Sequence, residues 1–255
     1  MTTRIYNAEL GFDGGPLSGF RNRLINGDFR IQQRTSSGAV GAYLLDRWYQ
    51  NFAGSAVTQS QGGAGLISNG ATSFYVPSSY VLTGATGNTA LNLYQRVERI
   101  NMIDMVGQTV TLSYWVFQST GTTMNVTSGF VYPTANDNYT STTNIGSTAA
   151  VAVPNGTWTK VVGSIAIPTA ATTGLQVTLL ANSPALVAGQ GITIANVQLE
   201  VGSVATPFEQ RNITVESLMC QRYYSQGTAG LIGTQFTATN VAHALLCTCG
   251  YTTKY

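Results

Sequence analysis

The residues of this chain that could do acid–base or nucleophilic chemistry are few. The 255-residue sequence contains one histidine, His243, in an apolar run near its end. A Ser-His-Asp or Cys-His arrangement would therefore have one candidate base. A glycosidase needs two facing carboxylates. Glu98 and Asp104 are a conceivable pair among the ten acidic residues, but both are equally suited to flank a turn. The sequence therefore predicts a protein without enzymatic activity.

The cysteines do not indicate a disulfide framework or a metal site. Cys220, Cys247 and Cys249 are an odd number and all lie late in the chain. Cys247 and Cys249 are separated by one residue, without the two-residue spacer and the second ligand pair of a zinc site. We expect no cofactor.

The charge pattern excludes two classes of partner. The net charge is +2, charged residues make up 9% of the chain, and no run of Lys and Arg occurs. A nucleic-acid partner is therefore not expected, because such binding needs a concentrated basic face. The sequence has no stretch of 18 apolar residues and no apolar signal-peptide core. We therefore expect that the protein is synthesised in a cytoplasm and does not insert into a membrane. Low charge also gives little self-repulsion, which favours an oligomer.

The elements that would position any site are predicted to be strands. Thr, Val and Tyr are abundant, 28 glycines supply turns, and short runs with a period of two recur along the chain. We expect a strand–turn–strand over 22–34. Further strands are expected over 73–76, 90–97, 110–117, 158–168, 175–180 and 192–199. The run 110–117 has large residues on both faces, which is typical of a central strand.

Three segments depart from this pattern. Residues 133–150 are rich in Ser, Thr and Asn and indicate a long polar loop. Residues 214–224 have helical spacing, with Thr214 as the N-cap. Residues 1–20 are Gly-rich and indicate an extended arm that orders on a partner. We therefore expect an arm over 1–20, a jelly-roll β-sandwich over 21–210, and a short helix with the start of a small β region over 211–255.

Several motifs together resemble a family of bacteriophage tail-fibre and virion-associated structural proteins. They are Asn22-Arg23-Leu24-Ile25-Asn26-Gly27-Asp28-Phe29-Arg30-Ile31-Gln32-Gln33-Arg34, Tyr43-Leu44-Leu45-Asp46-Arg47-Trp48, Val197-Gln198-Leu199-Glu200-Val201-Gly202-Ser203-Val204-Ala205-Thr206-Pro207-Phe208-Glu209 and Cys220-Gln221-Arg222-Tyr223-Tyr224. The match covers residues 22 to 224. The core also resembles carbohydrate-binding modules with a jelly-roll fold, through the Asn-Gly-Asp-Phe opening and the Thr-Leu-Ser-Tyr-Trp-Val strand.

The resemblance implies a virion protein, located on the tail, a fibre or the capsid surface. The first expectation is a tail or head fibre or appendage that recognises the host surface, in contact with other virion proteins of the tail, portal or capsid and trimeric like similar appendages. The first alternative is a capsid decoration protein that clamps shell subunits. The second alternative is a polysaccharide-binding or depolymerising module. The docking residues of the arm would be Ile5, Tyr6, Phe12 and Phe20.

The likeness to carbohydrate-binding modules implies a sheet face that holds a glycan. Aromatic rings stack on sugar rings, so the candidate binding residues are Trp115, Tyr75, Tyr80, Tyr132 and Tyr139. The alternative for Trp115 and Trp158 is a place in the core, which is also the expectation for Trp48.

The same likeness implies a structural calcium ion near the first and last strands. Asn26, Asp28 and Asn196 would lie there. Where those modules carry paired aspartates before the last strand, this chain has Ala195-Asn196. A neutral amide replaces a carboxylate there, so no metal is expected.

Overall fold

The protein is built from two antiparallel sheets that face each other. The computed structural model describes residues 20–34, 42–182 and 184–225. Every strand pairing among them is antiparallel. The six-stranded sheet has, in spatial order, β1 (Ala42–Tyr43), β2 (Tyr49–Gly54), β7 (Asn88–Val97), β14 (Leu175–Thr178), β10 (Gly129–Ala135) and β11 (Asn138–Ser147).

The second sheet has five strands. They are, in order, β13 (Thr159–Ala166), β8 (Thr109–Gln118), β15 (Gly191–Val201), β6 (Ser79–Thr83) and β3 (Thr58–Gly62). Two ribbons complete the strands: β4 (Gly65–Ser68) with β5 (Ser73–Val76), and β9 (Met124–Val126) with β12 (Val151–Val153). Strands that follow one another in the chain often belong to different sheets, as β6 and β7 do, and β13 and β14. The predicted all-β jelly-roll sandwich is confirmed.

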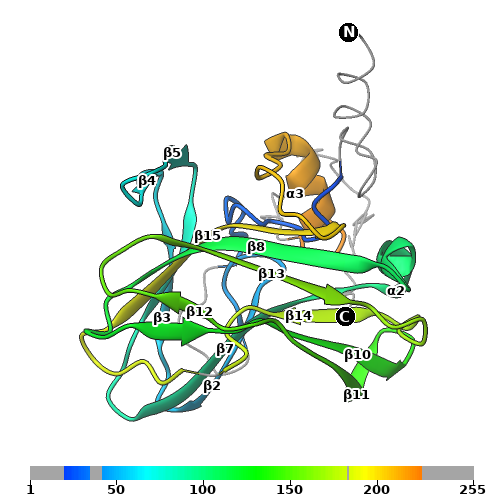
Figure 1. Ribbon diagram of the computed structural model, residues 1–255, viewed down its shortest axis with the longest axis horizontal. Coiled ribbons are helices and arrows are strands. Elements are labelled where there is room, and N and C mark those ends of the chain that lie inside the picture. Colours follow the sequence, from blue (N-terminus) through cyan, green and yellow to red (C-terminus); the bar gives the residue numbers. More distant parts are fainter. Residues whose placement is uncertain (1–19, 35–41, 183, 226–255) are drawn as a thin grey trace, which may run out of the picture.

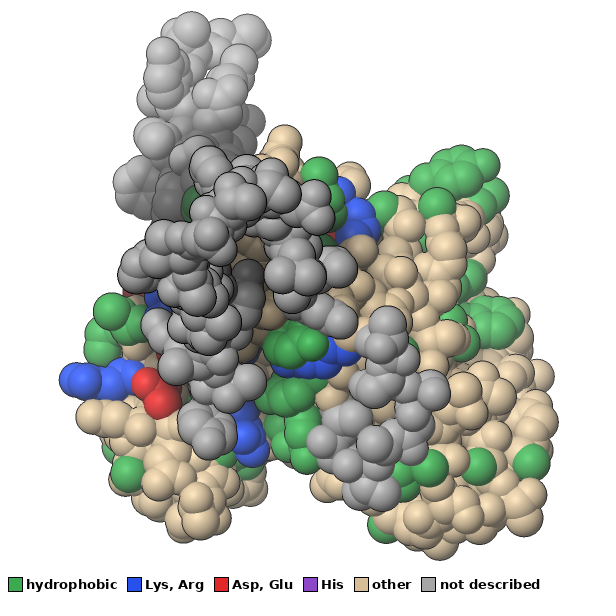
Figure 2. Space-filling view, turned by 180° about the vertical axis from the view of Figure 1, so that it is seen from behind, with side chains coloured by type: hydrophobic (Ala, Val, Ile, Leu, Met, Phe, Trp, Pro, Cys, Tyr) green, Lys and Arg blue, Asp and Glu red, His purple; other side chains and the backbone are tan. Residues whose placement is uncertain are grey.

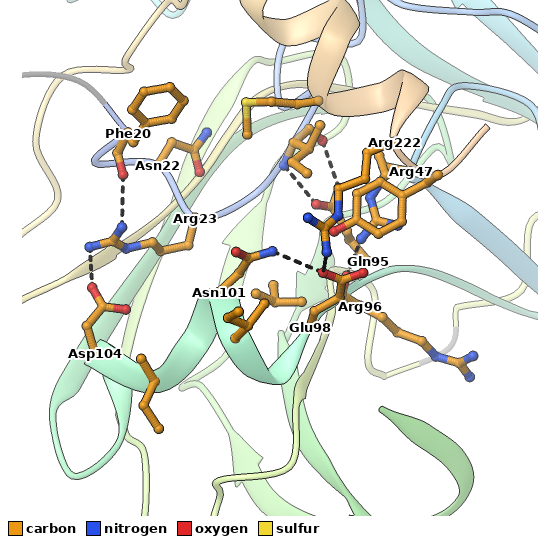
Figure 3. A pocket seen from close by; sticks show the side chains of 16 residues that line it. Phe20, Asn22, Arg23, Arg47, Gln95, Arg96, Glu98, Asn101, Asp104 and Arg222 are labelled. Atoms are coloured by element: carbon orange, nitrogen blue, oxygen red, sulfur yellow. Dashed lines mark hydrogen bonds and ion pairs between the residues drawn. The ribbon is translucent and has the colours of Figure 1, made fainter. Parts of the chain in front are cut away.

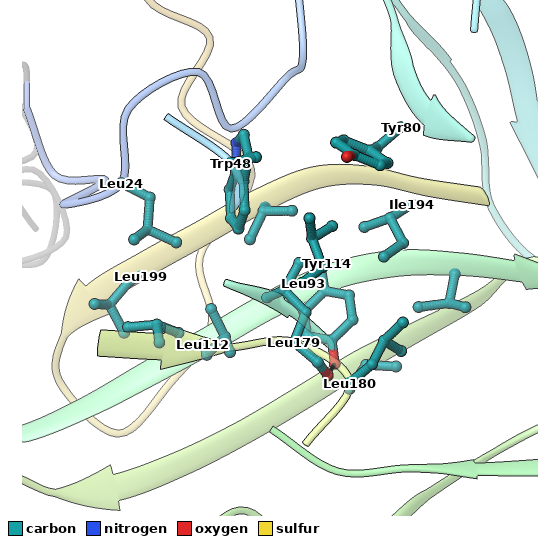
Figure 4. Close-up of a cluster of buried hydrophobic side chains, with 14 of the residues drawn as sticks. Leu24, Trp48, Tyr80, Leu93, Leu112, Tyr114, Leu179, Leu180, Ile194 and Leu199 are labelled. Atoms are coloured by element: carbon teal, nitrogen blue, oxygen red, sulfur yellow. Dashed lines mark hydrogen bonds between the residues drawn. The ribbon is translucent and has the colours of Figure 1, made fainter. Parts of the chain in front are cut away.

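The main core lies between the two sheets (Figure 4). Leu93 and Leu179 meet Leu112 and Tyr114 there, and all four side chains are fully buried. The predicted strand 110–117 is β8, and it is covered on both faces. Its even-numbered residues point into this core, whereas Trp115 packs in a second cluster with Ile67 of β4 and Val76 of β5. The β4–β5 hairpin thus covers part of the outer face of the five-stranded sheet.

Residues 20–34 do not form the expected strand–turn–strand. The segment is irregular and runs beside β15, where the Arg23 backbone N–H donates to the Leu199 carbonyl oxygen and Val197 N–H donates to the Gly27 oxygen, both at 2.8 Å. Asn26 and Phe29 have φ of 57° and 59°, which a strand does not allow. A side chain on Gly27 would lie 2.2 Å from the Val197 oxygen, so only glycine permits this approach.

The predicted polar loop 133–150 is also wrong. Most of it is β11, a ten-residue edge strand that pairs with β10. Both faces of β11 are largely exposed, so its Thr, Ser and Asn residues show no apolar alternation. Thr nevertheless suits a strand because its branched side chain fits a pleated surface.

The predicted helix is present as α3 (Ile213–Gln221). Its N-cap is Asn212 rather than Thr214, because the Asn212 side chain accepts the Thr214 backbone N–H. A further short helix, α2 (Arg99–Met102), followed by the 3₁₀ turn η1 (Ile103–Met105), was not expected. Figure 1 shows α3 and the β4–β5 hairpin on the same side of the five-stranded sheet. The arm residues Ile5, Tyr6 and Phe12, His243 and the C-terminal β region lie outside the described residues.

Candidate functional site

A groove runs across the outer face of the six-stranded sheet. Its volume is about 450 Å³, and its lining comes from β2, β7, β14, β10 and β11. The reverse view in Figure 2 shows the lower half of the molecule hollowed between two lobes, with few charged side chains on them. Strand register decides which residues reach this face, because side chains alternate between the core and the outside. Leu91, Leu93 and Val97 of β7 are buried in the core, and Asn92, Tyr94 and Arg96 therefore face the groove.

Three tyrosines form a row at one side of the groove. Tyr43, Tyr49 and Tyr94 lie directly opposite one another on β1, β2 and β7. The ring centroids of Tyr43 and Tyr49 are 5.0 Å apart, and those of Tyr49 and Tyr94 are 4.9 Å apart. Cross-strand aromatic pairs of this kind stabilise a sheet and hold each ring in place. The row presents a fixed aromatic surface at partly exposed positions.

The same row continues across the sheet with small residues. Tyr94 lies opposite Thr178 of β14, Thr178 opposite Gly129 of β10, and Gly129 opposite Ser147 of β11. Large rings on one side and a glycine in the middle leave the sheet surface hollow there. A side chain on Gly129 would contact Ala181 at 3.0 Å and reduce that space. The sizes of the side chains along this transverse row therefore produce the hollow.

A parallel row, further along the strands, has three polar residues and one valine. It contains Arg96, Gln176, Val131 and Asn144 in register. The Arg96 Nε donates to the Gln176 Oε1 at 3.0 Å. The guanidinium carbon lies 5.2 Å from the Tyr94 ring centroid and 4.4 Å from that of Tyr139. The guanidinium of Arg96 is therefore held between two rings in the groove.

The tyrosine hydroxyls of the groove remain protonated at neutral pH. Burial raises the pKa of Tyr94 to about 12, and the neighbouring Arg96 only partly offsets that rise. Burial, with a smaller contribution from the Asp137 carboxylate, also raises the pKa of Tyr139. Both phenols can therefore donate hydrogen bonds. Tyr139 uses its hydroxyl to donate to the Val97 carbonyl oxygen at 3.2 Å.

Two of the aromatic residues expected to hold a glycan are buried. Trp115 is 8% exposed and packs against Phe74 of the β4–β5 hairpin, with ring centroids 5.2 Å apart. Tyr80 is fully buried in the core, where its hydroxyl bonds to the Gln59 amide oxygen. Their place in the sheet corrects the expectation, because neither ring can meet a ligand. Trp158 is partly buried in the Trp115 cluster, and Trp48 lies in the core as expected.

The other three candidates are dispersed. Tyr139 lines the groove. Tyr132 is partly buried against the main core, and Tyr75 is 78% exposed on the hairpin beside the other sheet. Sequence reasoning missed Tyr94, Arg96 and Gln176, although the alternation within 90–97 and 175–178 could have placed them on one outer face.

The residues expected near a calcium ion do not fit one. The Asn26 side-chain oxygen accepts the Ile31 N–H at 3.0 Å, and its amide donates to Ile31 and Asp46 carbonyl oxygens. Asp28 is ion-paired with Arg30. The Asp28 Oδ1 and Asn196 Oδ1 atoms are the remaining oxygens of these side chains without a partner, whereas calcium takes six to eight ligands. Among the described residues, no group of three His, Cys, Asp or Glu could hold a metal ion.

A second pocket, of about 500 Å³, lies between α2–η1 and α3 (Figure 3). Glu98 and Asp104 both line it, but each is ion-paired with a different arginine: Glu98 with Arg222 at 2.6 Å, and Asp104 with Arg23. They do not form a facing pair of free carboxylates. Exposed apolar side chains are part of its lining; they are Phe20, Ile100 and Ile103.

No helix in the described part of the chain could cross a bilayer, and the longest, α3, has nine residues. No family model matches the chain, and no curated protein matches it. Among solved structures, the chain is similar to the enzymatically active domain of bacteriophage CBA120 tailspike protein 4, with 18% identity and a TM-score of 0.47. That likeness covers 71% of this chain and 21% of the tailspike chain.

Xylan-binding domains are also similar in structure. The CBM22-1 domain of Paenibacillus barcinonensis Xyn10C is 14% identical, with a TM-score of 0.36, and the likeness covers 69% of this chain and 98% of that one. The CBM22-2 domain of the same protein is 16% identical, with a TM-score of 0.40, and the likeness covers 65% and 98%. The class of protein that the strand order itself defines is a jelly-roll β-sandwich with one open, grooved sheet face.

Proposed function

We propose that this chain is a non-enzymatic structural protein of a bacteriophage virion, a fibre or similar appendage of tail or head, whose groove on the six-stranded sheet binds a glycan of the host surface. The observation that carries the binding part is the transverse row of Tyr43, Tyr49 and Tyr94 beside a hollow lined by amides, hydroxyls and Arg96. Sugar-binding sites combine a ring surface with a few fixed polar groups.

The groove can bind a sugar chain without rearranging. A pyranose would lie on the Tyr94 ring over the small residues Thr178 and Gly129, while the amides of Asn51 and Gln176 hydrogen-bond its hydroxyls. All of these residues belong to strands of one sheet, so their positions are set before binding. Little conformational entropy is then lost when the ligand binds.

We propose binding without bond cleavage. No carboxylate is among the described residues that line the groove, and hydrolysis of a glycosidic bond needs two of them. Glu98 and Asp104 are engaged by arginines elsewhere. Incubation with host capsular polysaccharide should therefore release no reducing ends; release that is lost on altering a carboxylate would establish a depolymerase instead.

The virion part of the proposal rests on the sequence motifs in residues 22–224. The exposed apolar side chains around Phe20 support it, because they lie where the described chain begins and where the arm, residues 1–20, joins the sandwich. The same face suits a capsid decoration protein that clamps shell subunits, so that function remains the second candidate. Copy number separates them: a few to a few dozen copies per particle indicate an appendage, and hundreds indicate decoration.

Deletion of residues 1–19 tests the docking role of the arm. The truncated protein should keep its thermal unfolding temperature and glycan binding but no longer join particles that lack the native chain. Incorporation at the full level would contradict the proposal. Sedimentation of the full chain tests the trimer that the resemblance implies.

A glycan array printed with host surface polysaccharides tests the binding site. Tyr94→Ala should lower the affinity at least about tenfold, because a stacked ring contributes 1.4 kcal/mol or more with its buried area. Tyr75→Ala is the matched control, since it removes an exposed tyrosine from the hairpin. Loss of binding in the control alone would move the site to the hairpin, and no binding by the unaltered chain would refute the proposal.

A further inference from the structure

The groove contains a single charge among its described lining residues. That residue is Arg96; the rest are tyrosines, amides, hydroxyls and small or apolar side chains. A carboxylate that acts on a lining residue, Tyr139, is Asp137, in the turn between β10 and β11. Its Oδ1 accepts the Arg99 backbone N–H at 2.7 Å, and it is not part of the lining. Arg96 is therefore the charged side chain that a ligand in the groove would meet.

Arg96 differs from most arginines of the described chain in having no ion pair. Six others are paired with carboxylates: Arg21, Arg23, Arg30, Arg34, Arg211 and Arg222. Figure 3 shows the Arg96 side chain extending away from Glu98, which bonds to Arg222 and Asn101 instead. A charged group that the fold leaves without a counter-ion in a ligand groove favours an anionic ligand.

The orientation of Arg96 suits a planar anion. Its Nε donates to Gln176, and its guanidinium lies between the Tyr94 and Tyr139 rings, which leaves the terminal amino groups without a hydrogen bond to a described residue. A guanidinium held this way offers two parallel N–H donors, the arrangement that matches a carboxylate. A purely structural arginine between two rings would not need to lie in an open groove.

We infer that the glycan of this groove is acidic, a polysaccharide that contains uronic acid, and that Arg96 binds its carboxylate while Tyr94 stacks on a sugar ring. This inference rests on the proposed glycan-binding function and specifies its ligand class. Sugar hydroxyls alone would be served by the amides and hydroxyls already present.

The test uses the full chain and an array of capsular polysaccharides that contain uronic acid, each printed both as the native polymer and in its carboxyl-reduced form. Reduction converts the carboxylate to a primary alcohol and leaves the linkages intact. Native polymer should bind at least about tenfold more tightly than its reduced partner, since a hydrogen bond to a charged group is the stronger kind. The preference should weaken as salt is raised.

Variants assign the preference to Arg96. Arg96→Gln should abolish the difference between the two forms, and an unchanged thermal unfolding temperature should show that the variant is folded. Arg96→Lys keeps the charge but not the two parallel donors and should retain part of the preference. Lys160→Gln, which removes a charge from β13 of the other sheet, should change nothing.

The possible outcomes distinguish a failure of the acidic-glycan inference from a failure of the proposed glycan-binding function. Equal binding of native and reduced polymers overturns the acidic-glycan inference and leaves glycan binding standing. A preference that survives Arg96→Gln overturns the role of Arg96. Failure of the chain to bind any polymer of either form overturns both the inference and the proposed function.

Discussion

The ring of Tyr49 lies 4.9 Å from the ring of Tyr94, directly across the β2–β7 ladder. The two rings support each other, and Tyr94 is the one that lines the groove. Tyr49 is therefore a positioning residue for Tyr94.

Replacement of Tyr94 by phenylalanine should keep most of the affinity for a glycan, because the stacking surface is the ring. Tyr49→Ala should weaken binding less than Tyr94→Ala, and should act by loosening the neighbouring ring. Isothermal titration with one polysaccharide measures all three variants. An equal loss in Tyr94→Phe and Tyr94→Ala would mean that the hydroxyl, not the ring, binds the sugar.

The hollow beside these rings can be filled. Thr178→Phe places an aromatic side chain on the floor of the groove, where it should abolish binding without changing the free energy of unfolding by more than about 0.5 kcal/mol. Thr140→Phe, on exposed β11 but outside the lining, is the control. Full glycan affinity in Thr178→Phe would show that ligand lies elsewhere on the molecule.

Trp115 distinguishes a core residue from a binding residue. It is covered by the β4–β5 hairpin, so Trp115→Ala should lower the free energy of unfolding by about 3 kcal/mol. Glycan affinity at a temperature where the variant is folded should be unchanged. Lost affinity with unchanged stability is the result that would restore Trp115 as a binding residue.

Asn22 joins the segment before the sandwich to the last strand. Its buried side chain donates to the Val197 carbonyl oxygen at 2.8 Å and accepts the Leu24 and Leu199 N–H groups at 3.0 Å. Asn22→Ala leaves these backbone groups unpaired and should lower the free energy of unfolding by about 3 kcal/mol. Denaturation in urea measures the loss. Asn22→Asp should not rescue it, because the donor is gone and Glu209 lies close by.

Tyr114 makes stability fall at alkaline pH. Burial raises its pKa above the ordinary value of 10.0, so between that pH and the folded-state pKa the unfolded chain loses a proton that the folded chain keeps. Its contribution is intact below pH 10 and declines as pH rises further, by about 1.4 kcal/mol per pH unit.

The variant Tyr114→Phe lacks this proton and the hydrogen bond to the Leu179 carbonyl oxygen at 2.7 Å. It should be less stable at pH 8, but the gap from the unaltered chain should narrow above pH 10. Urea unfolding at a series of pH values checks this. A constant gap would mean that Tyr114 does not titrate differently in the two states.

The strands were predictable where one face is buried. Residues 90–97 alternate between core and outside and form most of β7. Residues 192–199 lie in β15, where the apolar period of two in the sequence marks a strand although most of its side chains are buried. The edge strand β11 escaped prediction because both of its faces are exposed, which removes the apolar period that marks a strand. The turn-like segment 22–34 escaped because its shape depends on β15, about 175 residues later in the chain.

The groove could not be read from single residues. Trp115 and Tyr80 are attractive by type, yet the hairpin and the core cover them. Tyr94 and Arg96 gain their roles from register with Tyr49 and Gln176 on other strands. The motifs behind the resemblance contain residues that hold the backbone: Asn22 and Asn26 bond to backbone groups, and Glu200 accepts the Thr206 N–H at 2.9 Å.

The β4–β5 hairpin lies over part of the five-stranded sheet, whereas the groove proposed to bind a glycan lies on the outer face of the six-stranded sheet. With this one proposed site, a single copy binds a polysaccharide at one point. Several copies whose grooves point the same way would bind a repeating polymer at several points. Such a bundle gains avidity of 10² to 10⁴, to order of magnitude, from proximity alone. How tightly a particle adheres would thus be set by the number and spacing of its subunits more than by any one groove.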